Sequence, residues 1–282
     1  MTTGFSSAVQ RRPDELIDIL TADFQRRYEP NFAWKSAVSQ FLAIPALVGF
    51  WPMSAARVDN AIDRARDMAG GAYHLVDNNG VRFGFDDLAP YAEFLGTNEY
   101  LSRADGGIAD WADITGVETY VVPKQGGLTG GGWFYLDTLA QGNHKGFIGK
   151  YNDAAVDQRS YLLLFNDTTD VPTFIVSRLG TNATITAIDG PVLSASTWYF
   201  IVGRFTPGAD VEIFVNGTWY SAGAGPASIF DSEADFNIGS YSNGMAIHCL
   251  DGRASLCFLS AAAVSNAIVG QLWQQSRAMY GM

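Results

Sequence analysis

The sequence predicts a mainly β protein built as an antiparallel sandwich, with a helical N-terminal arm and a short C-terminal helix. From about residue 91, aromatic and β-branched residues recur at a period of two, as in strands with one buried face. Gly, Asn and Asp separate these segments as turns, and 30 of the 282 residues are glycine. Hydrophobic residues make up 48% and charged residues 17% of the chain, which is typical of a globular protein with a large core.

The N-terminal part predicts a helix over residues 13–28. Pro13 suits its first turn, and Asp14 and Glu15 favour the positive end of its dipole. Residues 1–44 are expected to form an arm ahead of a sandwich over residues 45–282. Two alternatives stay open: the arm folds back on its own sandwich, or it docks on another subunit or a larger assembly. The residues expected to make the arm's contacts are Leu16, Leu20, Phe24, Phe32, Trp34 and Phe41.

Short strands are predicted in series along the rest of the chain. They cover residues 91–101, 118–122, 131–137, 160–165, 172–177, 183–188, 197–205 and 211–215. The last of these ends at Asn216 and Gly217, a pair that favours a tight hairpin turn. Trp133 and Trp198 lie within strands and are expected in the core. The glycine cluster just before residue 133 is interpreted as a mobile loop; its members are Gly126, Gly127, Gly130, Gly131 and Gly132.

The chain closes with a predicted helix capped by Ser265 that should lie flat against the sandwich. Its apolar face comprises Ile268, Val269, Leu272 and Trp273, and Arg277 suits its C-terminal end. Only two cysteines are present, Cys249 and Cys257, and we expect both to be buried free thiols.

The negative net charge and the short length of the apolar runs argue against several kinds of partner. A net charge of −11 disfavours nucleic acid and anionic membrane surfaces. The longest apolar run, residues 41–51, is too short to span a bilayer and contains Pro45. No secretory signal is predicted at the N-terminus, so synthesis in a cytoplasm is expected.

Four segments, read in order, resemble the laminin-G-like, concanavalin A-like lectin and glucanase jelly roll. They are STWYFIVGRF (196–205), VEIFVNGTWY (211–220), DFNIGSY (235–241) and LDGRASLCFLSAAAVSNAIVGQLW (250–273). Upstream, residues 47–53 resemble the family's opening strand, 61–75 its Asp-containing loop and 91–101 its second strand. The resemblance covers roughly residues 45–282 and implies the fold rather than the ligand.

The whole chain, with a helical head before a jelly roll, is similar in architecture to virion proteins of tailed bacteriophages. This resemblance implies a structural protein on the virion surface, in capsid decoration or in the tail. The arm would bind other virion proteins, the sandwich would engage host-surface glycans, and a homotrimer would suit display. The alternatives are a free-standing carbohydrate-binding module or glycan-active enzyme, and a purely structural cement protein.

No catalytic motif is found in the sequence, and a non-enzymatic protein is expected. Glycan-hydrolysing jelly rolls carry a compact Glu-x-Asp-x-x-Glu arrangement on one strand, whereas Glu118 and Glu212 each stand alone. His74, His144 and His248 are isolated in sequence and lack the spacing of a zinc site.

Calcium and glycan are the ligands for which candidate residues exist. Jelly rolls of this kind often bind calcium at a rim loop, so calcium is a possible cofactor although none is required. The candidate calcium ligands are Asp63, Asp67, Asp105, Asp110 and Asp251, for which the alternative is a role in turns and caps. The candidate glycan contacts are Trp111, Trp219, Tyr220, Tyr241 and Asn243, for which the alternative is core or turn packing.

Overall fold

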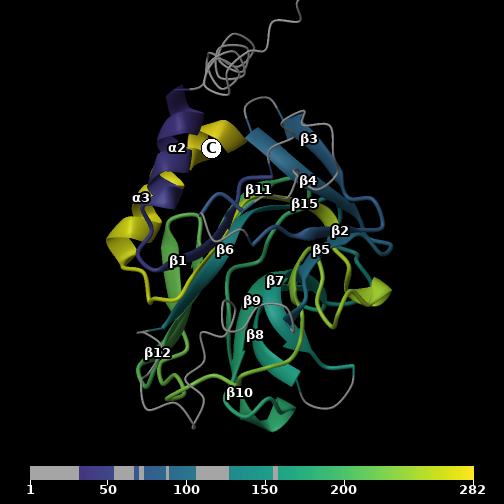
Figure 1. The fold of residues 1–282 in the computed structure, drawn as a ribbon, viewed down its shortest axis with the longest axis vertical. Coiled ribbons are helices and arrows are strands. Elements are labelled where there is room, and N and C mark those ends of the chain that lie inside the picture. The colour runs from purple at the N-terminus through teal and green to yellow at the C-terminus, as the bar shows by residue number, and fades with distance from the viewer. Residues whose placement is uncertain (1–31, 54–66, 70–72, 87–88, 106–126, 155–157) are drawn as a thin grey trace, which may run out of the picture.

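Two antiparallel sheets face each other in a computed structural model of the chain (Figure 1). The structure describes residues 32–53, 67–69, 73–86, 89–105, 127–154 and 158–282. One sheet has eight strands, in the order β13-β12-β11-β6-β15-β4-β3 with β1 paired to β15. The other has seven, in the order β10-β9-β8-β7-β14-β5-β2. The predicted jelly-roll sandwich is therefore confirmed.

The bounds of the strands follow the chain. The eight-stranded sheet contains β1 (Leu47–Trp51), β3 (Arg82–Asp86), β4 (Ala89–Leu95), β6 (Leu128–Leu136), β11 (Trp198–Thr206), β12 (Asp210–Val215), β13 (Thr218–Ser221) and β15 (Asp251–Ser260). The seven-stranded sheet contains β2 (Val76–Asn78), β5 (Tyr100–Arg103), β7 (Lys145–Asn152), β8 (Gln158–Asn166), β9 (Val171–Ser177), β10 (Ile185–Asp189) and β14 (Phe236–Ile238).

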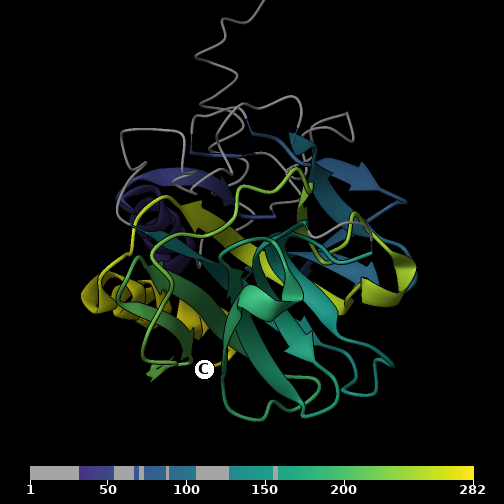
Figure 2. The same cartoon turned by 90° about the horizontal axis from the view of Figure 1, so that it is seen from below.

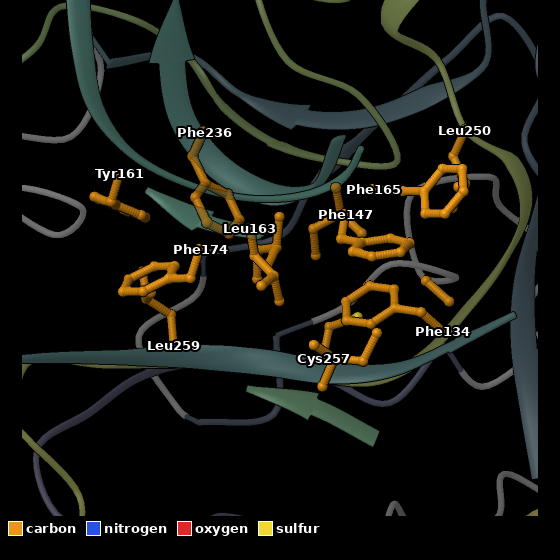
Figure 3. Packing of buried hydrophobic residues seen from close by; sticks show 14 of the residues in the cluster. Phe134, Phe147, Tyr161, Leu163, Phe165, Phe174, Phe236, Leu250, Cys257 and Leu259 are labelled. Atoms are coloured by element: carbon orange, nitrogen blue, oxygen red, sulfur yellow. The ribbon is translucent and has the colours of Figure 1, made fainter. Parts of the chain in front are cut away.

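The main core fills the space between the two sheets. Figure 3 shows aromatic and aliphatic side chains from both sheets meeting there, among them Phe134, Phe147 and Phe174. The rings of Phe134 on β6 and Phe147 on β7 stack with their centroids 4.5 Å apart. Burial of this apolar surface is the main stabilising term for such a fold.

Three of the five glycines interpreted as a loop lie in β6, so the interpretation was wrong for them; Gly127 precedes the strand and Gly126 lies outside the described residues. Gly130, Gly131 and Gly132 are buried in this strand, which pairs with β11 on one side and β15 on the other. A Cβ atom on Gly131 would overlap the backbone carbonyl of Ile201. The strand consists of glycine here because its neighbours leave no room for side chains, a requirement that local sequence does not reveal.

Helices cover part of the outer face of the eight-stranded sheet. Figures 1 and 2 show α2 (Phe32–Leu42) beside α3 (Asn266–Ser276), and Ser36 Oγ donates a 3.0 Å hydrogen bond to Gln275 Oε1. The ring of Phe41 stacks on Phe50 of β1 at 5.1 Å and is fully buried. The described part of the arm, from residue 35 to 44, therefore packs on the sandwich of its own chain, which agrees with the first alternative for this part alone.

Because α2 packs on the sheet, Phe41 has a different role from the assembly contact predicted for it. Phe41 belongs to the core between α2 and the sheet rather than to an assembly contact. Leu16, Leu20 and Phe24 lie outside the described residues, as do the side chains of Phe32 and Trp34.

Other expectations are confirmed. Asn216 and Gly217 take positive φ angles of 45° and 102° in the hairpin between β12 and β13. Ser265 caps α3 by accepting the N–H of Ile268. Both cysteines are buried free thiols. Trp133 and Trp198 are buried, although under the helices rather than between the sheets.

Several strand assignments differ from the prediction, among them residues 183–188, where a 3-10 turn over Asn182–Thr184 precedes β10, and the unpredicted β2 and β3. Residues 91–101 belong to β4 and β5, which lie in different sheets and are separated by a turn at Gly96 with φ 72°. The long strand β7 was not predicted, and residues 118–122 lie outside the described part. None of the helices in the described ranges is long and apolar enough to cross a membrane.

Candidate functional site

The predicted glycan contacts do not share one surface. Trp219 and Tyr220 are neighbours on β13 and therefore point to opposite faces of the sheet. Trp219 packs toward the helices, with its ring 5.2 Å from that of Phe214 and the Arg204 guanidinium carbon 4.0 Å from its centroid. Tyr220 packs against the core between the sheets.

Tyr241 lies on the outer face of the other sheet and is 3% exposed. Its ring stacks on His248 at 3.9 Å and meets Tyr151 edge-on at 5.8 Å, and burial raises the pKa of its hydroxyl. Asn243 is exposed, and its side-chain oxygen accepts the N–H of Asp235. Trp111 lies outside the described residues. Tyr241 thus fixes a loop on its sheet and leaves no ring face for a sugar.

The predicted calcium ligands are also dispersed. The carboxylate of Asp67 accepts the backbone N–H groups of Phe50 at 2.9 Å and Ala69 at 2.8 Å, which is the turn-capping role of the alternative. Asp105 forms an ion pair of 2.6 Å with the buried Lys150. Asp63 and Asp110 lie outside the described part. Among the residues that the structure describes, no three His, Cys, Asp or Glu side chains are placed to share a metal ion.

A different surface combines aromatic and charged side chains. Five residues occupy paired positions on five adjacent strands, β3, β4, β15, β6 and β11, of the eight-stranded sheet. We call them the cross-strand row: Arg82, Glu93, Arg253, Tyr135 and Trp198. The residues that alternate with them, such as Phe94 and Phe134, fill the core between the sheets. The row therefore lies on the outer face of the sheet.

The middle of the row is a charged and aromatic cluster. The Arg253 guanidinium carbon lies 4.8 Å from the ring centroid of Tyr135 and 4.8 Å from that of Tyr91, the nearest aromatic residue outside the row. Arg253 Nε is 3.5 Å from Glu93 Oε1, and the two side chains are 22% and 23% exposed. The Arg253 guanidinium thus lies over one face of each of the two tyrosine rings.

The two ends of the row differ. The side chain of Arg82 is exposed and forms no hydrogen bond or ion pair with another side chain in the described part. Trp198 at the other end is 6% exposed, because its ring meets Tyr280 at 5.0 Å. Tyr280 in turn stacks on Trp133 at 4.1 Å and shares a 2.7 Å hydrogen bond with Ser255. The row is thus open at Arg82 and closed by the C-terminal segment at Trp198.

A second, acidic line borders the row. Asp251 on β15 pairs with Leu95 on β4, and the N–H of Asp137, just after β6, donates to the Asp251 carbonyl. Burial and the nearby carboxylate of Asp137 raise the pKa of Asp251. Both backbone groups of Asp251 are held by the side chain of Gln141, at 3.0 and 2.9 Å. Asp251, predicted as a calcium ligand, thus lies at the edge of this surface.

Sequence analysis did not identify the cross-strand row. The only local sign was the alternation of Tyr91 and Glu93 on one strand face. Arg253 lies 160 positions from Glu93 in the chain, and only the pairing of β15 with β4 brings them together.

Comparisons with known proteins agree with the sandwich fold. No protein-family model matches the sequence, and a search of curated proteins finds none that is similar. Among solved structures, the binding domain of Paraclostridial Mosquitocidal Protein 1 is similar, with a TM-score of 0.58, 12% identity, and coverage of 83% of this chain and 52% of that one. The botulinum neurotoxin serotype D ligand-binding domain, in complex with N-acetylneuraminic acid, gives 0.55 and 8%, with 83% and 52% covered.

A third similar structure is a single domain. It is domain 4 of AbnA, an extracellular arabinanase from Geobacillus stearothermophilus, in complex with arabinotriose. The TM-score is 0.54 at 13% identity, and the match covers 82% of this chain and all of that domain. By contrast, this chain spans about half the length of the two toxin domains. At these identities the similarity shows a shared jelly-roll fold.

Proposed function

We propose that this protein is a non-enzymatic carbohydrate-binding protein and that the cross-strand row is its binding surface. The observation that carries the proposal is the row itself: five side chains of complementary chemistry on adjacent strands, of which Arg82 is exposed and Glu93, Arg253 and Tyr135 are partly exposed. Two of the similar folds are described with a bound saccharide, which supports the class of ligand without placing the site.

The chemistry of the row suits a polyhydroxyl ligand. The arginines only donate hydrogen bonds, the ionised Glu93 only accepts them, and the Tyr135 hydroxyl does both. Hydrogen bonds to charged groups are stronger than neutral ones, and an aromatic ring face can pack against the C–H groups of a sugar. A surface that alternates donors and acceptors over aromatic carbon can therefore bind the alternating hydroxyl and C–H groups of a carbohydrate.

The test is a glycan array followed by isothermal titration calorimetry with the full chain, with and without calcium. Glu93→Gln keeps the size of the side chain and removes its charge, and we expect it to weaken sugar binding by roughly fivefold or more. Tyr135→Phe removes a single hydroxyl and should also weaken binding. Glu233→Gln, an exposed carboxylate near the other sheet, is the matched control and should bind as the wild type does.

The outcomes separate the candidate functions. Sugar binding that survives both row variants would move the site elsewhere on the molecule. Sugar binding that requires calcium would support the aspartates predicted in the sequence as calcium ligands. No saturable sugar binding at all would favour the purely structural cement protein.

We further propose that the sandwich is displayed on a virion, in the capsid or the tail, and binds host-surface glycans there. The support is the architecture of the sequence, a helical arm followed by a jelly roll. Because α2 packs on the sandwich, we propose that Leu16, Leu20 and Phe24, which precede α2 in the sequence, make the contacts with other virion proteins. Copurification of the protein with phage particles tests this role, and a trimer is tested by light scattering.

A glycan-active enzyme is the alternative class, and one observation favours it. Asp251 has a raised pKa and lies beside Asp137, and a carboxyl group of raised pKa is a property of general acids. Release of reducing ends from a bound oligosaccharide, lost in Asp251→Asn, would establish an enzyme. A stable complex without turnover would support the binding protein.

A further inference from the structure

From the geometry and charge of the cross-strand row we infer its ligand class: an uncharged, linear oligosaccharide of several units that lies across the strands. This inference rests on the proposed carbohydrate-binding function and adds the length, orientation and charge of the ligand.

The length follows from strand pairing. The exposed and partly exposed members of the row, from Arg82 to Tyr135, occupy four adjacent strands about 4.8 Å apart, so their backbone positions span about 14 Å. One unit of a linear glycan is about as long as one strand spacing. The row therefore offers contacts to roughly three successive units, and a mono- or disaccharide would leave part of it unused.

The orientation follows from the two ends. Tyr280 and the C-terminal segment close the row at Trp198, where little ring surface remains exposed. Arg82 is exposed at the opposite end. A linear ligand can place one end over Tyr135, beside the closed end of the row, and extend toward Arg82, so that Arg82 contacts only the longer ligands.

The charge of the surface argues for an uncharged ligand. The row and its bordering line carry two cations, Arg82 and Arg253, and three carboxylates, Glu93, Asp137 and Asp251. The whole chain carries −11, so a polyanionic glycan would be repelled at long range. Arg253 is also already next to Glu93, which offsets its charge. Interleaved donors and acceptors with little net charge suit hydroxyl groups better than carboxylates or sulfates.

The experiment is calorimetry on the full chain with ladders of linear oligosaccharides, from two to six units. The probes are neutral arabinan, xylan and β-glucan ladders and an acidic galacturonan ladder. Each ladder is titrated into the wild type, Arg82→Ala and Arg178→Ala. Arg178 is an exposed arginine at the end of β9 in the other sheet and serves as the matched control.

We expect affinity for at least one neutral ladder to rise with each unit and to level off at roughly three units. Arg82→Ala should lower affinity for the tetrasaccharide by about tenfold, the usual loss for a hydrogen bond from a charged group, and the disaccharide by less. Arg178→Ala should match the wild type at every length, and the acidic ladder should bind more weakly.

Three results would overturn the inference. Affinity that does not change beyond two units contradicts the length, and an equal loss in Arg82→Ala at all lengths contradicts the orientation. Tighter binding of the galacturonan ladder contradicts the charge. In each case sugar is still bound, so the proposed function stands. Absence of binding to every ladder would refute the proposed function together with this inference.

Discussion

Replacement of Phe41 by alanine tests whether α2 is part of the fold. Phe41 is fully buried, stacks on Phe50 at 5.1 Å and meets the rings of Phe200 and Phe258 edge-on at 6.3 and 5.5 Å. Burial of such a ring contributes about 1.5–3 kcal/mol, and the cavity left among three rigid aromatic neighbours adds to the loss. We therefore expect Phe41→Ala to lower the free energy of unfolding by about 3–5 kcal/mol.

The assay is urea unfolding of the full chain, followed by tryptophan fluorescence. Leu42→Ala changes the next residue of the same helix, which is 41% exposed, and should alter stability by less than about 0.5 kcal/mol. If Phe41→Ala costs no more than this control, α2 does not pack on the sandwich in solution, and residues 32–44 would again be available to dock on a partner.

Three further predictions concern stability. Gly131→Ala should lower the free energy of unfolding by at least about 1–3 kcal/mol, because the new Cβ atom would overlap backbone atoms. Gly270→Ala in the middle of α3 has open space and should raise the free energy of unfolding by about 0.5–1 kcal/mol. Thermal unfolding measures both. Burial lowers the pKa of His248, so the folded state favours the neutral ring. The free energy of unfolding should therefore fall as the pH drops below about 6.5, where the unfolded chain binds a proton more readily than the folded one. Urea titrations at pH 8 and pH 5 measure this fall, which should be smaller in His248→Phe. Asp105→Asn removes the carboxylate that pairs at 2.6 Å with the buried Lys150 ammonium and should lower stability by about 1–3 kcal/mol, and adding Lys150→Met should recover part of this loss in the same titrations.

The sequence was sufficient for features that depend on local chemistry. The cap at Ser265 and the turn at Asn216 and Gly217 follow from hydrogen bonding and φ preferences within a few residues. The strands after residue 158 follow from runs of aromatic and β-branched residues between turn residues, although β8 and β11 are buried on both faces rather than alternately. The resemblance to a concanavalin A-like jelly roll predicted the overall architecture, which the two sheets confirm.

Features that depend on distant strands could not be predicted. The glycines of β6 have no side chains to show a period, and β7 contains glycine and lysine at positions that its neighbours bury. Trp219 and Tyr220 look like one aromatic pair in sequence, but the sheet separates them onto two faces. The cross-strand row depends on the register of four pairings, and a shift of one residue in any of them would disperse it.

The glycines of β6 also determine which substitutions evolution could accept in related sandwiches. A side chain at Gly130 would first meet the Leu259 side chain at 3.0 Å, so a smaller residue at position 259 could compensate for it. A side chain at Gly131 would meet the backbone of Ile201 and Val202, and no substitution of those residues removes backbone atoms. We therefore expect positions 130 and 259 to covary among relatives, whereas position 131 stays glycine unless the spacing between β6 and β11 itself changes.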